Sequence, residues 1–163
     1  MRVVGERVGL ARSSVYQYFA SAEELLAAVV ADVFPDWAGR VLAEVATAST
    51  PGERVWAYIR ANIDLFASSE QAVAVALTRV VDPQVLQGPM HEFHAQLQAP
   101  LHQALRDLGE TEPDAMAKHV NSLVVQATRD LEGAEPEAAG DLRDHALGRL
   151  RRLLRGYLSL PEA

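Results

Sequence analysis

The stretch that most constrains the fold is residues 4–26, which read VGERVGLARSSVYQYFASAEELL. Apolar residues recur at helical spacing in two short segments, 2–8 and 12–19, and Gly9 lies between them. Glycine adopts positive φ without steric cost, so Gly9 favours a tight turn after the first segment. The pattern predicts two short helices joined as a helix-turn-helix. The spaced apolar residues are Val4, Val8, Val15 and Phe19.

The run from Gly5 to Phe19, followed by Ser21-x-Glu23-Glu24-Leu25-Leu26, resembles the DNA-binding motif of the TetR family of bacterial transcriptional regulators. The resemblance implies a second short helix that lies in the major groove of double-stranded operator DNA. It also implies a homodimer formed by the last two helices and a small-molecule effector bound in the body of the chain, residues 37–132. The DNA-contacting residues that it implies are Arg2, Arg12, Ser13, Ser14, Tyr16, Gln17 and Tyr18.

The chemistry of these side chains suits that role. Arg12 begins the second short helix and can form two parallel hydrogen bonds with a guanine edge. Ser13 and Ser14 are small, so the backbone can approach DNA closely, and their hydroxyls can bind a base or a phosphate. Gln17 and Tyr18 can donate to phosphate oxygens and fix the register of the protein on the DNA. Tyr16 can touch a base edge or a thymine methyl.

The sequence departs from the family in two ways. The family has one more helix before this motif, packed across the other two, and Ala22 stands where the family usually has a lysine. We therefore expect residues 1–33 to be an incomplete helix-turn-helix region with its connecting helix, whose DNA affinity depends on an upstream extension. A gel-shift comparison of this chain with an extended version tests this expectation, and equal sequence-specific binding by both would contradict it.

The charge distribution favours contact with DNA at one end only. The chain has a formal net charge of −7 at pH 7. Residues 1–20 hold Arg2, Arg7 and Arg12 against Glu6, a net charge of +2, so residues 21–163 hold −9. A basic end on an acidic body suits a protein that approaches DNA with that end.

The composition also bears on the compartment. The chain has no cysteine, which fits a reducing compartment, and no basic-then-apolar signal opens it. Its longest apolar run, residues 25–31, has seven residues. A membrane span needs about 18 or more. These features predict a cytoplasmic protein with no membrane partner.

The rest of the chain predicts an all-α fold of about eight helices, because apolar residues keep helical spacing and no segment alternates with period 2. Proline lacks an N–H and clashes with the preceding turn, so we expect breaks or kinks at Pro35 and Pro100. Beyond the head, the predicted helices cover 21–33 (after a capping box at Ser21 and Glu24), 37–45, 50–67, 70–81, 88–108, 113–132 and 137–158, with a brief turn or helix at Asp82-Pro83.

Residues 34–163 are predicted to form the effector-binding and dimerisation domain. Aromatic side chains with a few polar groups among aliphatic residues are what a ligand cavity needs. The same residues also serve as ordinary core, because aromatics usually bury for packing. Few charges lie on these faces, which favours an uncharged or aromatic effector. The candidate ligand-binding residues are Trp37, Trp56, Tyr58, Asn62, Phe66, Phe93, His94 and His119.

The last helix carries two adjacent apolar stripes, a face wide enough to pack on its own domain and on a partner. The candidate dimer residues on the last two helices are Leu123, Ala127, Leu131, Leu147, Leu150 and Leu154. A cluster of arginines at 149, 151, 152 and 155 lies on the same helix. We interpret this cluster as arginines placed where the dipole at the C-terminus of a helix favours positive charge. The alternative is a second patch that binds nucleic acid.

The sequence also bears on two other classes of function, metal binding and catalysis. His91 and His94 at i, i+3, with His102 further on, could share a metal, but the HExxH spacing is absent and zinc needs more ligands. No nucleophile–base arrangement or glycine-rich phosphate loop is present, so we expect no enzyme, cofactor or metal site. The alternative to a regulator is a dimerising small-molecule-binding helical module without a functional DNA head. A small helical metal-binding protein or enzyme comes third.

Overall fold

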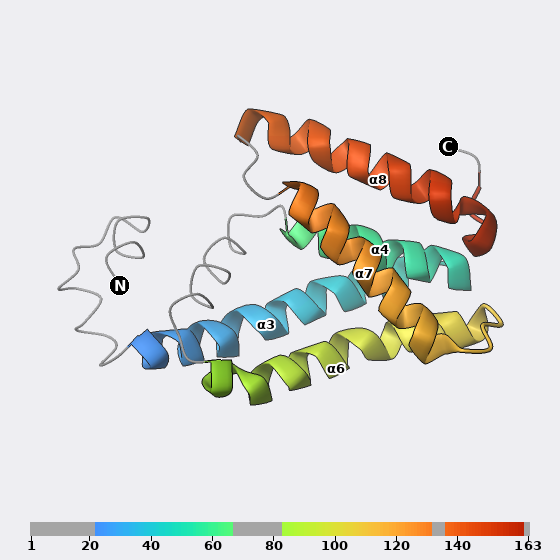
Figure 1. Cartoon of the computed structure of the whole chain (residues 1–163). Coiled ribbons are helices and arrows are strands. Elements are labelled where there is room, and N and C mark those ends of the chain that lie inside the picture. The colour runs from blue at the N-terminus through green and yellow to red at the C-terminus, as the bar shows by residue number, and fades with distance from the viewer. Residues whose placement is uncertain (1–21, 67–82, 132–135, 162–163) are drawn as a thin grey trace.

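The computed structural model describes residues 22–66, 83–131 and 136–161. All regular structure in these ranges is helical, so the all-α prediction is confirmed for them. The five helices are α3 (Ala22–Thr47), α4 (Pro51–Phe66), α6 (Pro83–Asp107), α7 (Pro113–Leu131) and α8 (Pro136–Leu158), as Figure 1 shows. The predicted helices 2–8, 12–19 and 70–81, and the capping serine Ser21, lie outside the described residues.

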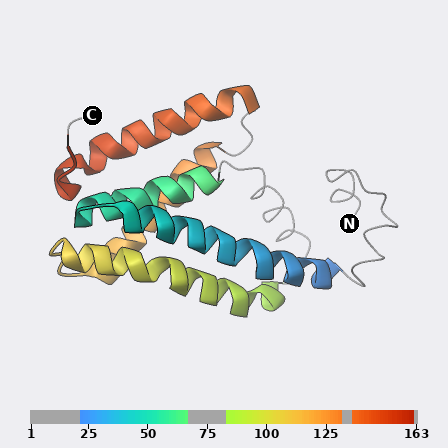
Figure 2. The same ribbon diagram turned by 180° about the vertical axis from the view of Figure 1, so that it is seen from behind.

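Helix α4 forms the middle of the bundle and packs against α3, α6, α7 and α8. Figures 1 and 2 show α3 and α6 side by side, with α8 across α4 from them and α7 crossing between the two sides. The apolar stripe of α4 is fully buried at Val55, Ile59 and Ile63. A helix with neighbours on every side buries its apolar residues most completely, and this burial supplies the main stabilisation of the fold.

The start of α4 follows from its own sequence. The Thr50 backbone N–H donates to Glu53 Oε2 at 3.0 Å, and the Glu53 N–H donates to Thr50 Oγ1 at 3.2 Å. This reciprocal capping box satisfies two backbone donors that no helical carbonyl can reach. Pro51 follows at the first helical position, where its missing N–H costs nothing. The predicted start at Thr50-Pro51 is confirmed.

The predicted break at Pro35 is wrong, because α3 is one helix of 26 residues that passes through this proline. Pro35 removes one backbone hydrogen bond and crowds the preceding turn. The residues that follow it compensate, since Trp37, Ala38 and Val41 are buried in the core. Tertiary packing of one apolar face outweighs a local defect in a helix. The predicted domain boundary after residue 33 therefore falls inside α3.

Helix α6 also differs from the sequence prediction. It begins at Pro83 rather than at Gly88-Pro89, and it runs without interruption past Pro100 to Asp107. At Pro83 the missing N–H lies in the first turn, where no intrahelical acceptor exists. The later part of α6 is fixed in the core by Leu97, Leu101 and Leu105, which are buried. The predicted end at Gly109 is confirmed, because Gly109 has φ of 91° directly after this helix.

Charged side chains tie the helices together at their edges. Arg143 of α8 pairs with Asp64 of α4 at 2.7 Å, and Arg54 of α4 pairs with Asp107 of α6 at 2.9 Å. These groups are about one-third exposed, so each pair contributes little free energy and chiefly fixes relative position. None of the helices in the described ranges has the length and apolar content that crossing a membrane requires.

Candidate functional site

The residues predicted to contact DNA are not among those that the structure describes. Arg2, Arg12, Ser13, Ser14, Tyr16, Gln17 and Tyr18 all lie outside the described residues. Their roles stay predictions. The described residues belong to the connecting helix and to the predicted effector-binding and dimerisation region.

Three of the eight candidate ligand residues come together in the core. Trp37 of α3 donates its indole N–H to Asn62 Oδ1 of α4 at 3.4 Å. Asn62 in turn donates from Nδ2 to the backbone carbonyl of Tyr58, one turn earlier, at 2.8 Å. All three are buried, with exposed fractions of 7%, 5% and 4% for Trp37, Asn62 and Tyr58. A buried indole or amide is stable only with such partners.

A fourth residue, Asn121 of α7, completes this group. The Tyr58 hydroxyl donates to Asn121 Oδ1 at 2.8 Å. We call Trp37, Tyr58, Asn62 and Asn121 the α4 clasp, because one turn of α4 is hydrogen-bonded to α3 on one side and to α7 on the other. Asn121 was not predicted from the sequence. It follows the core residue Val120 along α7, and nothing local distinguishes it from other polar residues beside an apolar stripe.

The α4 clasp is suited to hydrogen bonding rather than to acid–base chemistry. Burial raises the pKa of Tyr58 to about 12, from an ordinary value of 10.0. Burial penalises the charged phenolate, so the hydroxyl stays neutral at physiological pH. The clasp therefore presents neutral donors and acceptors surrounded by aromatic and aliphatic side chains.

Trp56, His94 and His119 are not among the residues of the clasp. Trp56 is half-buried elsewhere on α4, and the Arg151 guanidinium of α8 lies 5.7 Å from the centroid of its ring, a cation–π contact. His94 and His119 are exposed on α6 and α7. The side chains of Phe66 and Phe93 lie outside the described part of the structure.

The histidines predicted as possible metal ligands do not gather into a site among the described residues. His102 lies with Nδ1 3.5 Å from Asp114 Oδ1, which links α6 to α7. Over the described residues, no group of three or more His, Cys, Asp or Glu side chains is placed to hold a metal ion. The side chain of His91 is not among those described.

The six candidate dimer residues face the chain's own core in this structure. Ala127, Leu147 and Leu150 are buried, and the others are half-buried and packed against the same core cluster. Their role between copies stays a prediction. The half-buried members are Leu123, Leu131 and Leu154.

A different apolar set of α7 and α8 points to solvent. Leu153 is 66% exposed, and Val125, Leu142 and Tyr157 also remain exposed. The sequence predicts one stripe of the last helix at Leu142, Ala146, Leu150, Leu153 and Tyr157 and a second at Leu147, Leu154 and Leu158. The structure divides the first stripe, because its two middle members, Ala146 and Leu150, are buried and the other three are exposed. The outer face of α7 and α8 thus has apolar area without a covering element in the described part of the chain.

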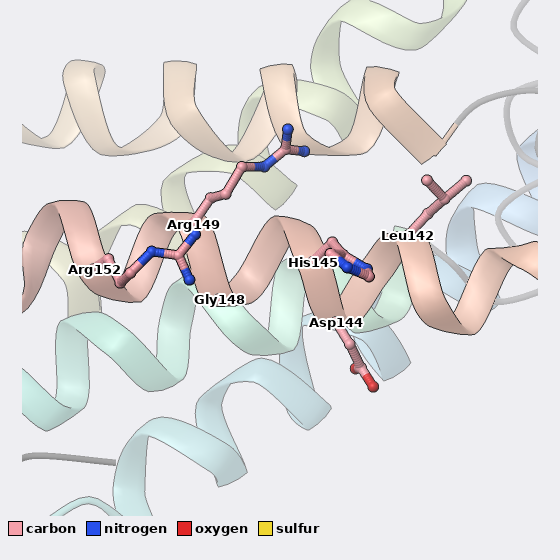
Figure 3. A pocket seen from close by; sticks show the side chains of 6 residues that line it. All are labelled: Leu142, Asp144, His145, Gly148, Arg149 and Arg152. Atoms are coloured by element: carbon pink, nitrogen blue, oxygen red, sulfur yellow. The ribbon is translucent and has the colours of Figure 1, made fainter.

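A hollow of about 640 Å³ lies at the surface of α8, and all the residues that line it belong to this helix. Gly148 is one of its lining residues, and the Arg152 guanidinium lies 3.6 Å from where a Cβ of Gly148 would stand. Figure 3 shows Arg152 reaching back towards Gly148, while Arg149 extends to the other side, where it pairs with Asp130 of α7 at 3.3 Å. The lining residues are Leu142, Asp144, His145, Gly148, Arg149 and Arg152.

No known protein-family model and no curated protein matches this chain. Its function therefore has to be inferred from its own residues. Two features are available for that inference besides the N-terminal motif: the neutral polar clasp around α4, and the outer face of α8 with its hollow at Gly148.

Proposed function

We propose that this chain is a ligand-responsive DNA-binding transcriptional regulator of the TetR type, acting as a repressor. It is a cytoplasmic homodimer that holds palindromic operator DNA with its N-terminal heads and releases it when a small molecule binds the body. The observation that carries the proposal is the motif at residues 5–26, whose last residues belong to α3. One helix thus leads from the groove-reading sequence into the packed core.

The mechanism follows from that connection. Two recognition helices fit successive major grooves only when they lie about 34–36 Å apart. The second half of α3 is held in the core through Trp37, Ala38, Val41 and Val45, so a shift of the core at these residues also displaces the helix that leads to the head. A ligand that prefers the displaced arrangement draws the population away from DNA, by no more than its differential affinity for the two states.

The effector we propose is an uncharged or aromatic molecule that bears a hydrogen-bonding group. The support is the chemistry of the α4 clasp, where Trp37, Tyr58 and Asn62 offer neutral donors and acceptors among apolar neighbours. A charged group brought there without a partner costs several kcal/mol or more, which disfavours ionic effectors.

The test is selection of random double-stranded DNA by the chain in a version extended upstream, because the head is expected to be incomplete without that extension. The expected result is enrichment of a palindrome whose half-sites are one helical turn apart. Arg12→Ala should then weaken binding to that sequence about 5- to 150-fold and relax the preference at one base pair. The matched control is Lys118→Ala, an exposed cation on α7, which should leave binding unchanged. Failure of the extended chain to enrich any sequence would overturn the proposal.

The second candidate is a dimerising small-molecule-binding module without a functional DNA head. The observation that favours it is the net charge of −9 on residues 21–163, which opposes general affinity for nucleic acid. The two candidates separate in the same selection, because only the regulator retains DNA. Ligand-dependent thermal stabilisation, which both candidates predict, reports on the body alone.

A further inference from the structure

We propose that the hollow at Gly148 is a binding site for a small phosphate monoester, held by Arg149 and Arg152 of α8. The site is separate from the α4 clasp, none of whose four residues belongs to α8. It therefore goes beyond the proposed function and requires neither the N-terminal head nor an effector in the body. Three observations carry it: a row of basic side chains, the space above a glycine, and a neighbouring carboxylate that is already paired.

Three basic side chains form a row along one face of α8. His145, Arg149 and Arg152 follow one another at i, i+4 and i+7, a spacing that places them on the same side of a helix. All three are exposed, and all three line the hollow. Side chains of a helix lean towards its N-terminus. Figure 3 shows both arginines extending towards the end of α8 that holds His145.

The opposite side of α8 packs on the chain's own core. Ala146, Leu147 and Leu150 are buried there. A ligand bound over the basic row therefore disturbs no core contact, and its site includes none of the leucines predicted for the dimer.

Gly148 leaves space for a ligand beside Arg152. The hollow has a volume of about 640 Å³, which lies within the range of roughly 300–1,000 Å³ found for small-molecule sites. Arg152 Nη1 is 3.6 Å from where a Cβ of Gly148 would stand, so any side chain larger than a methyl would take up this space. Arg152 makes no hydrogen bond or ion pair with any residue that the structure describes. Its planar guanidinium can therefore bind two oxygens of one phosphate group.

Arg149 can add a second cation to the site. Its Nη2 pairs with Asp130 of α7 at 3.3 Å, longer than the roughly 2.7–2.9 Å of a strong charge-assisted hydrogen bond. A guanidinium has five N–H donors, so this one contact leaves others for a ligand.

His145 presents one ring nitrogen to the hollow side of the row. Its Nδ1 lies 2.6 Å from the backbone oxygen of Asp141. Because a carbonyl oxygen only accepts, Nδ1 carries the hydrogen, and Nε2 is left for a ligand. Nε2 accepts from a phosphate hydroxyl when the ring is neutral and donates to a phosphate oxygen when the ring is protonated. A phosphate monoester, which loses its second proton near pH 6, can meet either form.

The charges around the hollow favour one small dianion over a long polyanion. Asp144 also lines the hollow, but Arg143 Nη1 donates to its Oδ1 at 2.6 Å and offsets its charge. Residues 136–147 hold three carboxylates and one arginine, so a nucleic-acid backbone laid along α8 would meet repulsion over this half. A phosphate monoester carries a charge of about −1.5 to −2 at pH 7, which matches two guanidinium groups.

The remaining lining residue indicates what the phosphate is attached to. Leu142 is 41% exposed and lies one turn before His145. An apolar organic group attached to the phosphate would contact this side chain. Phenyl phosphate has both parts and is the probe for the experiments.

The first experiment titrates phenyl phosphate into the full chain at low salt by isothermal calorimetry. Saturable binding is expected, and Arg152→Gln should weaken it by about tenfold or more, because it removes a charge-assisted pair. The matched control is Arg106→Gln, the same change at an exposed arginine of α6, which lies across α4 from α8. It should leave the affinity within about twofold, since salt screens a distant charge. Absence of saturable binding, or equal effects of the two variants, would overturn the proposal.

The second experiment fills the hollow without changing any charge. Gly148→Leu should abolish binding of phenyl phosphate, because its side chain occupies the space beside Arg152. Gly148→Ala should retain binding, because its methyl only reaches ordinary contact with that guanidinium. Both changes raise helix propensity, so a loss of binding does not come from a weaker helix, and far-UV circular dichroism checks this. Binding by Gly148→Leu at the affinity of the parent would contradict the site.

The third experiment locates the ligand by nuclear magnetic resonance. The ring signals of His145, identified by their loss in His145→Gln, should shift as phenyl phosphate is added at constant pH. Those of His94, which is exposed on α6, should stay in place. Equal shifts of both histidines would show that the anion has no preference for α8 and would refute the assignment.

The last experiment tests the class of anion with phenyl sulfate, benzoate and a short DNA duplex as competitors. Phenyl phosphate should bind most tightly, because phenyl sulfate and benzoate each carry a single negative charge and gain less from the two arginines. Equal affinities for the three small anions would show that the site does not select a phosphate monoester. A duplex that binds more tightly than phenyl phosphate, and loses that affinity in Arg152→Gln, would assign the basic row to nucleic acid and overturn the proposal.

Discussion

The backbone of Gly52 lies directly against the carbonyl of Leu158. A Cβ at position 52 would stand 1.8 Å from that oxygen and 2.8 Å from the carbonyl carbon. The first turn of α4 thus contacts the last turn of α8 without any side chain between them. The contact places the C-terminal end of α8 on the central helix, and Leu158 itself is buried.

Gly52→Ala should destabilise the fold by about 2 kcal/mol, because the added methyl forces the two backbones apart. The measurement is the free energy of unfolding from urea denaturation. The matched control is Gly39→Ala, also at a helical glycine but with open space around it. That change should stabilise the protein by about 0.5–1 kcal/mol through higher helix propensity. Equal effects of the two substitutions would contradict the close contact.

Asn62→Ala should cost about 2 kcal/mol, because it removes the Asn62 acceptor of the Trp37 indole together with a donor to the Tyr58 carbonyl, both in the core. Tyr58→Phe removes only the hydroxyl at the α7 side and should cost about 1 kcal/mol. The exposed Gln126→Ala on α7 is the control, expected within about 0.5 kcal/mol of the parent. If Asn62→Ala falls in that same range, the clasp does not contribute to stability.

In an alkaline titration, the Tyr58 hydroxyl should ionise at a higher pH than an ordinary tyrosine. The pKa of Tyr58 is raised to about 12, so the folded state binds its proton more tightly than the unfolded state, where ionisation occurs near 10.0. Stability from this group is complete below pH 10 and is lost as the pH rises towards 12. The difference in ultraviolet absorbance between the parent and Tyr58→Phe should show this step near pH 12. A difference step centred at pH 10 would refute the burial of the hydroxyl.

Acid should weaken the contact between the end of α8 and the α6–α7 connection. The Tyr157 hydroxyl donates to Glu110 Oε2 at 2.6 Å, and this hydrogen bond, followed by the Glu112 backbone N–H, lowers the pKa of Glu110 below 4.5. The folded state therefore releases this proton more readily than the unfolded state. Its contribution is present above pH 4.5 and is lost as the pH falls through the lowered pKa.

The check for this contact is the acid dependence of the free energy of unfolding in the parent and in Tyr157→Phe. The variant should show the shallower decline below pH 4.5, since its Glu110 lacks the strongest of the bonds to the carboxylate. Parallel curves for the two proteins would show that the hydrogen bond does not influence ionisation.

For the candidate ligand site, the sequence predicted the types of residue but did not show which of them lie together in the structure. It selected Trp37, Tyr58 and Asn62, which do meet in the core. It also selected His94 and His119, which lie exposed on other helices. It missed Asn121, because the bond from Tyr58 joins residues 63 positions apart and no local pattern marks such a pair.

The sequence by itself determined the features that depend on neighbours within a few residues. These are the helical character of the described chain, the capping box at Thr50 and the helix end before Gly109. Each of them rests on local hydrogen bonds or on the conformation of one residue. Such interactions are the same in a peptide as in the folded protein.

The tertiary structure alone decided the continuity of α3 through Pro35, the closeness of Gly52 to Leu158 and the side of α8 that turns inward. Apolar spacing gave the last helix two possible inner stripes. Packing on α4 and α7 buried members of both stripes, Ala146 and Leu150 from one and Leu147 and Leu158 from the other. It left Leu142, Leu153 and Tyr157 exposed. The physical reason is that burial is non-directional, so it selects among faces only when distant elements bring their own surfaces together.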